Sequence, residues 1–316
     1  MPPDNGRPEH SIAMFGAPTS GKTTFLAALS IALARQGSEW KVVGTDDAST
    51  DTLIKLTTAL GDHTFPPATQ GIDRFHWMLI GRVARSAARR RRSDPKQQED
   101  AIRIGLDLVD AQGEILGDRK RHAFRDDLIN NLVRSRGIIF FFDPTSEADR
   151  GDAFEHTYGV VLQLAQKMAS TLASDGSLPH YVAVCISKFD DARVYATAEK
   201  LNMVISDPID PYGFPRVDDS DAREFFTNLC KVSKSGMADL VLTTLEQHFQ
   251  PERIKFFVSS AVGFYLDPIS GIYDPENYQN LLPDPDEPDK TRIRGAIHPI
   301  NVVEPMIWLG TQLTAK

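Results

Sequence analysis

The chain has 316 residues, of which 41% are hydrophobic, enough for a packed core in one large domain or two small ones. Its formal net charge of −8 argues against general affinity for nucleic acids, so nucleic acid is not an expected partner. The two cysteines, Cys185 and Cys230, lack the spacing of metal ligands and support neither a disulfide framework nor a zinc site. Cys185 lies in an apolar run and is expected in the core.

The first residues are polar, and the longest apolar stretch near them is far shorter than the roughly 20 residues that a membrane-spanning helix needs. We therefore expect a cytoplasmic protein without a membrane span, in which residues 1–10 are flexible. Residues 267–289 contain no Lys or Arg and are rich in Pro, Asp and Glu, which predicts an irregular acidic surface segment.

Short apolar runs rich in β-forming residues alternate with amphipathic segments along the chain. The expected strands are residues 11–15, 74–80, 101–109, 137–142, 180–186 and 254–260. The expected helices cover residues 24–35, 124–134 and 154–172 and much of 300–313. This alternation predicts an α/β fold with a mostly parallel sheet that is covered on both faces.

Two of the expected strands differ from the others because apolar and polar residues alternate along them. Residues 74–80 and 102–109 show this period of two, which predicts an antiparallel pair joined by a long tip that includes Arg82–Arg92. This arginine-rich tract is either a solvated hairpin loop or a docking patch for an acidic partner or a phosphate backbone. Because expected strands run from residue 12 to residue 260, we predict one domain over residues 1–316. Its expected insertions are near 37–66, 83–99, 191–236 and 264–298.

A phosphate-binding motif follows the first expected strand. Residues 16–23 fit the pattern GxxxxGK[ST] between an apolar strand and a helix, the context that makes this motif specific. Backbone N–H groups of such a loop surround phosphates, Lys22 reaches the terminal phosphates, and Thr23 offers its hydroxyl to Mg²⁺. The residues expected to bind the nucleotide here are Gly16, Ala17, Pro18, Thr19, Ser20, Gly21, Lys22, Thr23 and Thr24.

A DxxG pattern, Asp110 to Gly113, follows the second alternating strand. The Asp110 carboxylate is expected to hold a Mg²⁺-bound water, and the Gly113 N–H to meet the γ-phosphate. In isolation this common pattern indicates a polar turn after a strand rather than a nucleotide contact.

Two further patterns follow later strands and concern the base of the nucleotide. Ser187, Lys188 and Asp190 fit [NST]KxD, in which a carboxylate accepts two hydrogen bonds from N1–H and the exocyclic amine of guanine. Adenine offers no such pair of donors, so this arrangement favours guanine. After the last expected strand, Ser259, Ser260 and Ala261 place backbone N–H groups where one can meet the guanine O6.

With these motifs in this order, residues 11–262 and the final helix resemble the Ras-like, translation-factor-related GTPases. The resemblance implies a three-layer P-loop GTPase fold with one antiparallel edge strand, GTP or GDP as ligand, and Mg²⁺. It also implies a first-switch threonine as a metal ligand, which by position is Thr69, with Thr64 as the alternative. A narrower resemblance to the bacterial double-GTPase proteins rests on residues 16–35, 65–69, 138–146 and 300–309.

The narrower resemblance implies a nucleotide-gated switch in a bacterial conflict or defence system. A protein effector or activating partner is then expected, and a second GTPase is one candidate.

Three departures from the family pattern bear on catalysis. Glu114 stands where many such enzymes have a water-orienting glutamine, so intrinsic hydrolysis is expected to be slow, and Gln112, Glu114 or a partner's residue orients the water. Pro18 replaces a common glycine and restricts the approach of a partner's arginine. Ser187 replaces asparagine but leaves the deciding Asp190. The expected catalytic residues are Lys22, Thr69, Gln112, Gly113 and Glu114.

The segment 117–125 carries several positive charges after the DxxG motif, and it either reports the nucleotide state to a partner or forms a polar helix face. The sequence as a whole predicts a Mg²⁺-dependent GTP-binding protein that hydrolyses GTP slowly and acts as a molecular switch. A nucleotide-binding scaffold with scarcely any turnover, and a P-loop kinase or ATPase, remain alternatives.

Overall fold

The computed structural model describes residues 10–35, 37, 39–66, 72–82, 102–111, 118–206, 210–285, 287 and 291–315. Within these residues the main element is a seven-stranded sheet. Its strands, in spatial order, are β2 (Lys41–Gly44), β3 (Ile72–Gly81), β4 (Ile102–Ala111), β1 (His10–Gly16), β5 (Gly137–Phe142), β6 (Tyr181–Ile186) and β9 (Ile254–Val258).

Strand β3 is the one strand of this described sheet that runs against the others. It pairs antiparallel with β4, where Phe75 lies opposite Leu108, and with β2, where Met78 lies opposite Val43. The remaining neighbours pair in parallel. The predicted mostly parallel sheet, with antiparallel pairing toward its edge, is confirmed. Of the predicted tip between β3 and β4, residues 83–101 lie outside the described residues.

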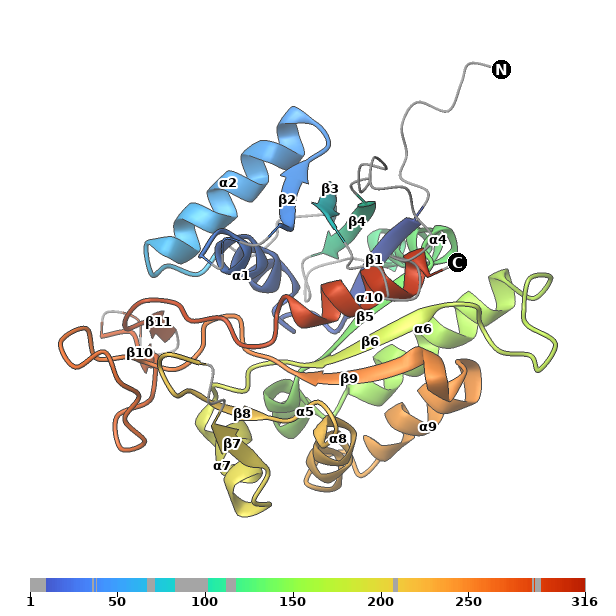
Figure 1. The fold of residues 1–316 in the computed structure, drawn as a ribbon. Coiled ribbons are helices and arrows are strands. Elements are labelled where there is room, and N and C mark those ends of the chain that lie inside the picture. Colours follow the sequence, from blue (N-terminus) through green and yellow to red (C-terminus); the bar gives the residue numbers. More distant parts are fainter. Residues whose placement is uncertain are drawn as a thin grey trace, which may run out of the picture.

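Helices cover both faces of the sheet, so the fold has three layers (Figure 1). The alternation along β1 shows how the two faces form: Ile12 and Met14 face one core, whereas Ala13 and Phe15 face the other. The first core is covered by α1 (Lys22–Arg35), α2 (Asp47–Gly61) and α10 (Glu304–Thr314). The second is covered by α4 (Asp118–Arg134), α6 (Ala153–Lys167), α7 (Ala192–Lys200), α8 (Ala222–Lys231) and α9 (Asp239–His248).

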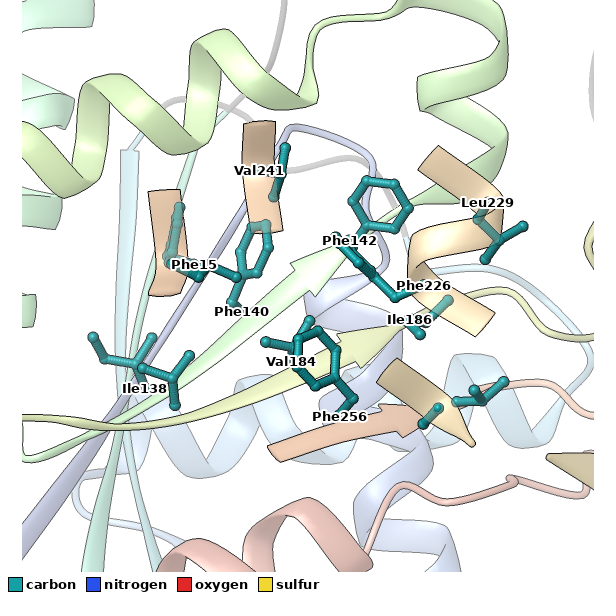
Figure 2. Close-up of a cluster of buried hydrophobic side chains, with 14 of the residues drawn as sticks. Phe15, Ile138, Phe140, Phe142, Val184, Ile186, Phe226, Leu229, Val241 and Phe256 are labelled. Atoms are coloured by element: carbon teal, nitrogen blue, oxygen red, sulfur yellow. The ribbon is translucent and has the colours of Figure 1, made fainter. Parts of the chain in front are cut away.

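Aromatic side chains fill much of the second core. Figure 2 shows Phe140 and Phe142 of β5 on the same side of the sheet as Phe226 of α8 and Val241 of α9. The rings of Phe142 and Phe226 lie 4.7 Å apart, centroid to centroid, in an edge-to-face arrangement. This packing fixes the end of β5, after which the chain continues into α5 (Pro144–Arg150).

The predicted insertions contain further short elements. Segment 37–66 supplies β2 and α2, which the sequence did not assign as a strand and a helix. The other described elements are α5 (Pro144–Arg150), β7 (Val204–Ser206), β8 (Pro215–Val217), a 3₁₀ turn (Pro251–Arg253), β10 (Leu281–Pro283) and β11 (Thr291–Ile293). Cys185 and Cys230 are both buried with free thiols, as expected for Cys185. The one-domain division stays a prediction.

Of the helices in the described segments, none is both long enough and apolar enough to cross a bilayer.

Candidate functional site

The predicted site begins where the parallel strands end. In register, Gly16 of β1 lies opposite Phe141 of β5, Phe142 lies opposite Ile186 of β6, and Ile186 lies opposite Val258 of β9. The residues that follow these strands therefore emerge at one edge of the sheet. Ligands of open α/β sheets bind at such carboxyl edges.

The loop from Gly16 to Lys22 has the backbone of a phosphate cradle. A Cβ atom on Gly16 would stand 2.7 Å from the carbonyl oxygen of Phe141, so only glycine fits against β5. Gly21 has φ of 90°, and no described atom lies within 4 Å of where its Cβ would stand. The N–H groups of Thr19 and Gly21 donate to none of the described residues. These donors and the N-terminus of α1 fit a phosphate ligand.

Lys22 is the first residue of α1, and its side chain folds back over the loop. Its Nζ donates to the carbonyl oxygens of Ala17 at 3.1 Å and Gly16 at 3.3 Å. The residue is only 7% exposed. The ammonium is thus already held inside the cradle, where the negative charge of terminal phosphates would be bound. Thr24 and half-buried Thr23 follow in the first turn of α1.

The metal side of the predicted site is described only in part. Met14 lies opposite Leu108, and the same register continued by two residues brings the backbone of Asp110 level with Gly16. The backbone of Asp110 and the first turn of α1 with Thr23 therefore lie at the same edge of the sheet, and their role as holders of Mg²⁺ stays a prediction. Thr69, Gln112, Gly113 and Glu114 lie outside the described residues.

Three further observations concern metal binding and the switches. No cluster of three or more metal-ligating His, Cys, Asp or Glu side chains occurs within the described part of the chain. Thr64 lies just after α2, where its N–H donates to the carbonyl oxygen of Ala59. Residues 118–125 of the positively charged segment belong to α4.

The SKxD residues form a tight turn after β6. The Ser187 hydroxyl donates to the carbonyl oxygen of Phe142 at 3.1 Å, which ties the turn to β5. Lys188 has φ of 59°, a left-handed conformation that costs a non-glycine residue on the order of 1 kcal/mol. The buried ring of Phe189, which packs on Tyr195 and Phe264, holds the turn in place.

Asp190, the last residue of this motif, is buried and is hydrogen-bonded to the segment after β9. The Ser260 hydroxyl donates to Asp190 Oδ1 at 2.5 Å and itself accepts the N–H of Gly263 at 2.7 Å. Burial raises the pKa of the Asp190 carboxyl to about 6, and the Ser260 hydrogen bond opposes part of that rise. The carboxylate is therefore held in place by Ser260 but poorly solvated, as expected of a group that accepts hydrogen bonds from a ligand.

The residues after β9 differ in whether their backbone N–H groups already donate a hydrogen bond. The N–H of Ser259 donates to Ile186 and that of Ser260 to Ile300, both to carbonyl oxygens. The N–H of Ala261 donates to no described residue. Of the three residues predicted to meet the guanine O6, the geometry thus favours Ala261.

Two residues that the sequence reasoning did not select belong to this site. Asp143, directly after β5, accepts Lys188 Nζ at 2.6 Å and the N–H groups of Thr145 and Ser146, and so caps α5. Arg150, at the end of α5, contacts the phosphate loop at Pro18 and Thr19. The pair Asp143–Pro144 is a recognisable helix-start signal, whereas the contact of Arg150 has no local signature.

Residues 10–35 thus form the strand, loop and helix of a P-loop unit on a mainly parallel sheet. No family model matches the chain, and no curated protein does. Among solved structures it is similar to the GTP-bound GTPase-like domain of Ski7 from S. cerevisiae. That match is 12% identical with a TM-score of 0.39, and it covers 97% of this chain and 50% of the Ski7 chain.

The chain is also similar to the signal recognition particle receptor complex of SRb-GTP and SRX from Chaetomium thermophilum. The identity is 14% and the TM-score 0.37, over 80% of this chain and 91% of the other. A third match is bacterial selenocysteine-specific elongation factor EF-Sec, with 14% identity and a TM-score of 0.32, over 81% of this chain and 26% of that one. The chain spans half the length of the Ski7 chain. At these low scores the similarities by themselves assign no activity.

Proposed function

We propose that this chain binds GTP and GDP, hydrolyses GTP slowly with Mg²⁺, and works as a nucleotide-gated switch. One observation carries the proposal: the buried Asp190 carboxylate is fixed by Ser260 beside the unpaired N–H of Ala261. The Asp190 carboxylate can accept from N1–H and the N2 amine of guanine, and the Ala261 N–H can donate to O6. Together they are complementary to this edge of the base. Adenine, with an amine where guanine has O6, matches neither.

The register of the strands supports one cleft for the whole nucleotide. Asp190 follows β6, Ala261 follows β9, and the phosphate loop follows β1, and all three strands end at the same edge of the sheet. In the proposed complex the loop N–H groups and Lys22 hold the phosphates. Thr23 and Thr69 would hold Mg²⁺ directly and Asp110 through water, and the ion would supply positive charge that offsets the charge of the phosphates.

The proposed reaction is attack of water on the γ-phosphorus. A bond forms from the water oxygen to phosphorus, the bond from phosphorus to the β–γ bridging oxygen breaks, and GDP, inorganic phosphate and a proton leave. Charge grows on the bridging and γ-phosphate oxygens in the transition state, where Lys22 and the Gly113 N–H are proposed to stabilise it. Gln112 or Glu114 is proposed to orient the water.

Loss of the γ-phosphate then ends the contacts that order the segments around Thr69 and 111–125, which is the proposed switch. We further propose a cytoplasmic bacterial protein with an effector or activating partner, for which a second GTPase is a candidate. Glu114 in place of glutamine favours a second candidate function, a nucleotide-binding scaffold that scarcely turns over.

The base assignment predicts a change of specificity in Asp190→Asn. An asparagine amide offers an N–H donor where the carboxylate accepted one, so it repels the guanine amine but matches the C2 carbonyl of xanthine. We expect GDP and GTP affinity to fall on the order of 10²-fold or more, with a gain for xanthosine nucleotides. Titration calorimetry of the purified protein measures both.

Asp191→Asn is the matched control, because Asp191 is the next carboxylate and caps α7 through the N–H of Arg193. It should leave nucleotide preference unchanged. If the wild-type chain binds ATP as tightly as GTP, or if Asp190→Asn keeps its preference for guanine, the base assignment is wrong. Phosphate release over many turnovers then separates a slow GTPase from a scaffold.

A further inference from the structure

A guanidinium lies on the phosphate loop at the one position where the loop has no donor of its own. Pro18 carries no N–H, whereas the other loop residues do. Arg150 Nη2 donates to the carbonyl oxygen of Pro18 at 3.3 Å and to the Thr19 hydroxyl at 3.4 Å. Arg150 is 132 residues further along the chain than Pro18, so the fold alone creates this contact.

The backbone that carries Arg150 is firmly held. Asp143 caps the start of α5, and Gly151 ends it with φ of 72°, where a Cβ would stand 2.8 Å from that of Ser235. Buried Glu147 accepts the N–H of Ala153 at 2.9 Å and the hydroxyl of Ser235 at 3.0 Å. The start of the Arg150 side chain is thus fixed relative to the loop.

The guanidinium has donors and exposed surface that a ligand in the loop can use. Its two contacts to the loop are long for hydrogen bonds, and 41% of its side-chain surface is exposed. Asp152 Oδ2 lies 3.3 Å from Nε, and the Ser146 hydroxyl 2.5 Å from Nη2. Nη1 has no hydrogen-bond partner among the described residues. The head is therefore retained beside the loop with donors to spare.

We propose that Arg150 is a catalytic arginine supplied by the chain itself, which donates to the terminal phosphates of bound GTP. The inference rests on the proposed function, because it needs GTP in the loop. Loop residues at Pro18 and Thr19 wrap the terminal phosphates, so a guanidinium already in contact with both stands next to the oxygens on which charge grows during hydrolysis. An arginine in this role is worth on the order of 10³-fold or more in rate.

The placement of Arg150 also fits the other departures of the site. Pro18 is expected to restrict the approach of a partner's arginine to the γ-phosphate, and Arg150 already contacts the loop at Pro18 and Thr19. A charge that comes from the same chain needs no such route. The partner's role is then left to the segment around Glu114, where the attacking water must be oriented.

Arg150→Ala and Arg150→Lys test this assignment, with Arg193→Ala as the matched control. Arg193 lies on α7, and its side chain pairs with Asp149 and Asp191 rather than with the loop. We expect Arg150→Ala to bind GTP within about threefold of the wild type but to release phosphate on the order of 10³-fold more slowly in a single turnover. Arg150→Lys should recover part of that rate, because it retains the charge without the planar fork. Melting curves check that the variants are folded.

A second readout does not need turnover. GDP with aluminium fluoride mimics the charge of the transition state, so the wild type should form this complex without a partner, and Arg150→Ala should not. If the wild type binds GTP but forms no such complex, or if Arg150→Ala hydrolyses GTP and binds the mimic as the wild type does, Arg150 only braces the loop. Failure to bind GTP at all instead overturns the proposed function, so the two failures are distinguishable.

Discussion

Gly16 and Gly21 are both glycines of the phosphate loop, but the structure needs them for different reasons. Gly16 is limited by space, because the backbone of β5 passes directly over it. Gly21 is limited by its backbone, because φ of 90° is strained for any residue with a Cβ. The first glycine therefore supports the sheet, and the second shapes the turn that presents donors to a ligand.

Gly16→Ala tests the space limit. The added methyl would stand 2.7 Å from the Phe141 carbonyl oxygen and 2.9 Å from its Cβ, so β1 and β5 must shift apart. We expect a loss of about 1–3 kcal/mol in the free energy of unfolding and weaker GTP binding, measured by urea denaturation and calorimetry.

Gly61→Ala is the control for this change. Gly61 is the last residue of α2, with no described atom within 4 Å of its added methyl. The alanine should raise the free energy of unfolding by at most about 1 kcal/mol and leave GTP binding unchanged. Equal losses in both variants would show that crowding against β5 is not the cause.

At the residue scale, sequence reasoning reached the side chains whose spacing is local. Lys22 and Asp190 stand at fixed positions in short motifs, so their expected roles need no tertiary information. The choice of Ala261 as the free donor was not accessible, because it depends on the pairing of Ser260 with Ile300, 40 residues away. Arg150 was missed for the same reason.

At the scale of elements, α5 joins the two ends of the proposed cleft. Its first residues are capped by Asp143, which also holds Lys188 of the base turn, and its last residue contacts the phosphate loop. Figure 1 shows this short helix where β5 ends. We therefore expect a change at either end of α5 to affect both the base and the phosphate contacts.

Substitution of Asp143 tests this connection. Asp143→Asn keeps an acceptor for the N–H groups of Thr145 and Ser146 but removes the ion pair with Lys188. Asp143→Ala removes both, so it should be the less stable variant by about 1 kcal/mol, the usual value of a cap. Both should bind GTP more weakly than the wild type, as measured by calorimetry.

Asp46→Ala provides the control, since Asp46 caps α2 through the N–H of Ser49 at 2.7 Å. It should lose a similar cap energy without loss of GTP affinity. Unchanged affinity in both Asp143 variants would contradict a role for the Asp143–Lys188 pair in the base turn.

The elements themselves were predictable where their pattern is strong. All six expected strands and the helices α1, α4, α6 and α10 are present. Their apolar residues repeat over enough positions to indicate the type of element from the sequence alone. Strand β2 was missed because it has four residues and a half-buried pattern, so it carries no clear alternation. Helix α5 was missed because seven residues are too few to show a helical stripe.

At the scale of the whole molecule, two buried ionisable groups act on stability in opposite directions. Burial lowers the pKa of His180 to about 4, although its Nε2 lies 3.0 Å from the carbonyl oxygen of Leu132. Below about pH 6.5 the unfolded chain binds this proton and the folded chain does not, so stability falls as pH falls. The raised pKa of Asp190 makes the folded chain bind more protons than the unfolded chain between the ordinary value of 3.8 and about 6, so stability falls as pH rises through that range.

Urea denaturation of the nucleotide-free protein between about pH 4 and pH 7 tests both signs. His180→Gln, which retains an N–H donor, should lose less stability than the wild type on acidification. Asp190→Asn should gain stability relative to the wild type above pH 6, because asparagine carries no charge where the wild-type carboxyl is buried and ionised. Parallel pH profiles for all three proteins would show that neither group is shifted as described.

The layered architecture was predictable as a class, because near-continuous apolar strands imply a parallel sheet with two covered faces. The spatial order of the strands was not, apart from the antiparallel pair of β3 and β4. That order depends on the face of the sheet on which each connecting helix crosses. Ile12 and Ala13 belong to the cores on opposite faces, but the sequence does not tell which helices cover each of them.

Helix α10 packs across β6, β1 and β5, and its side chains Met306 and Leu309 are buried against the sheet. All three strands precede Glu304–Thr314, which comes last in the chain among the described elements. Until these residues have been synthesised, the core on the Ile12 and Met14 side of β1 therefore lacks part of its cover. The strand that leads into the phosphate loop is thus fully packed only after a segment nearly 300 residues further along has joined it.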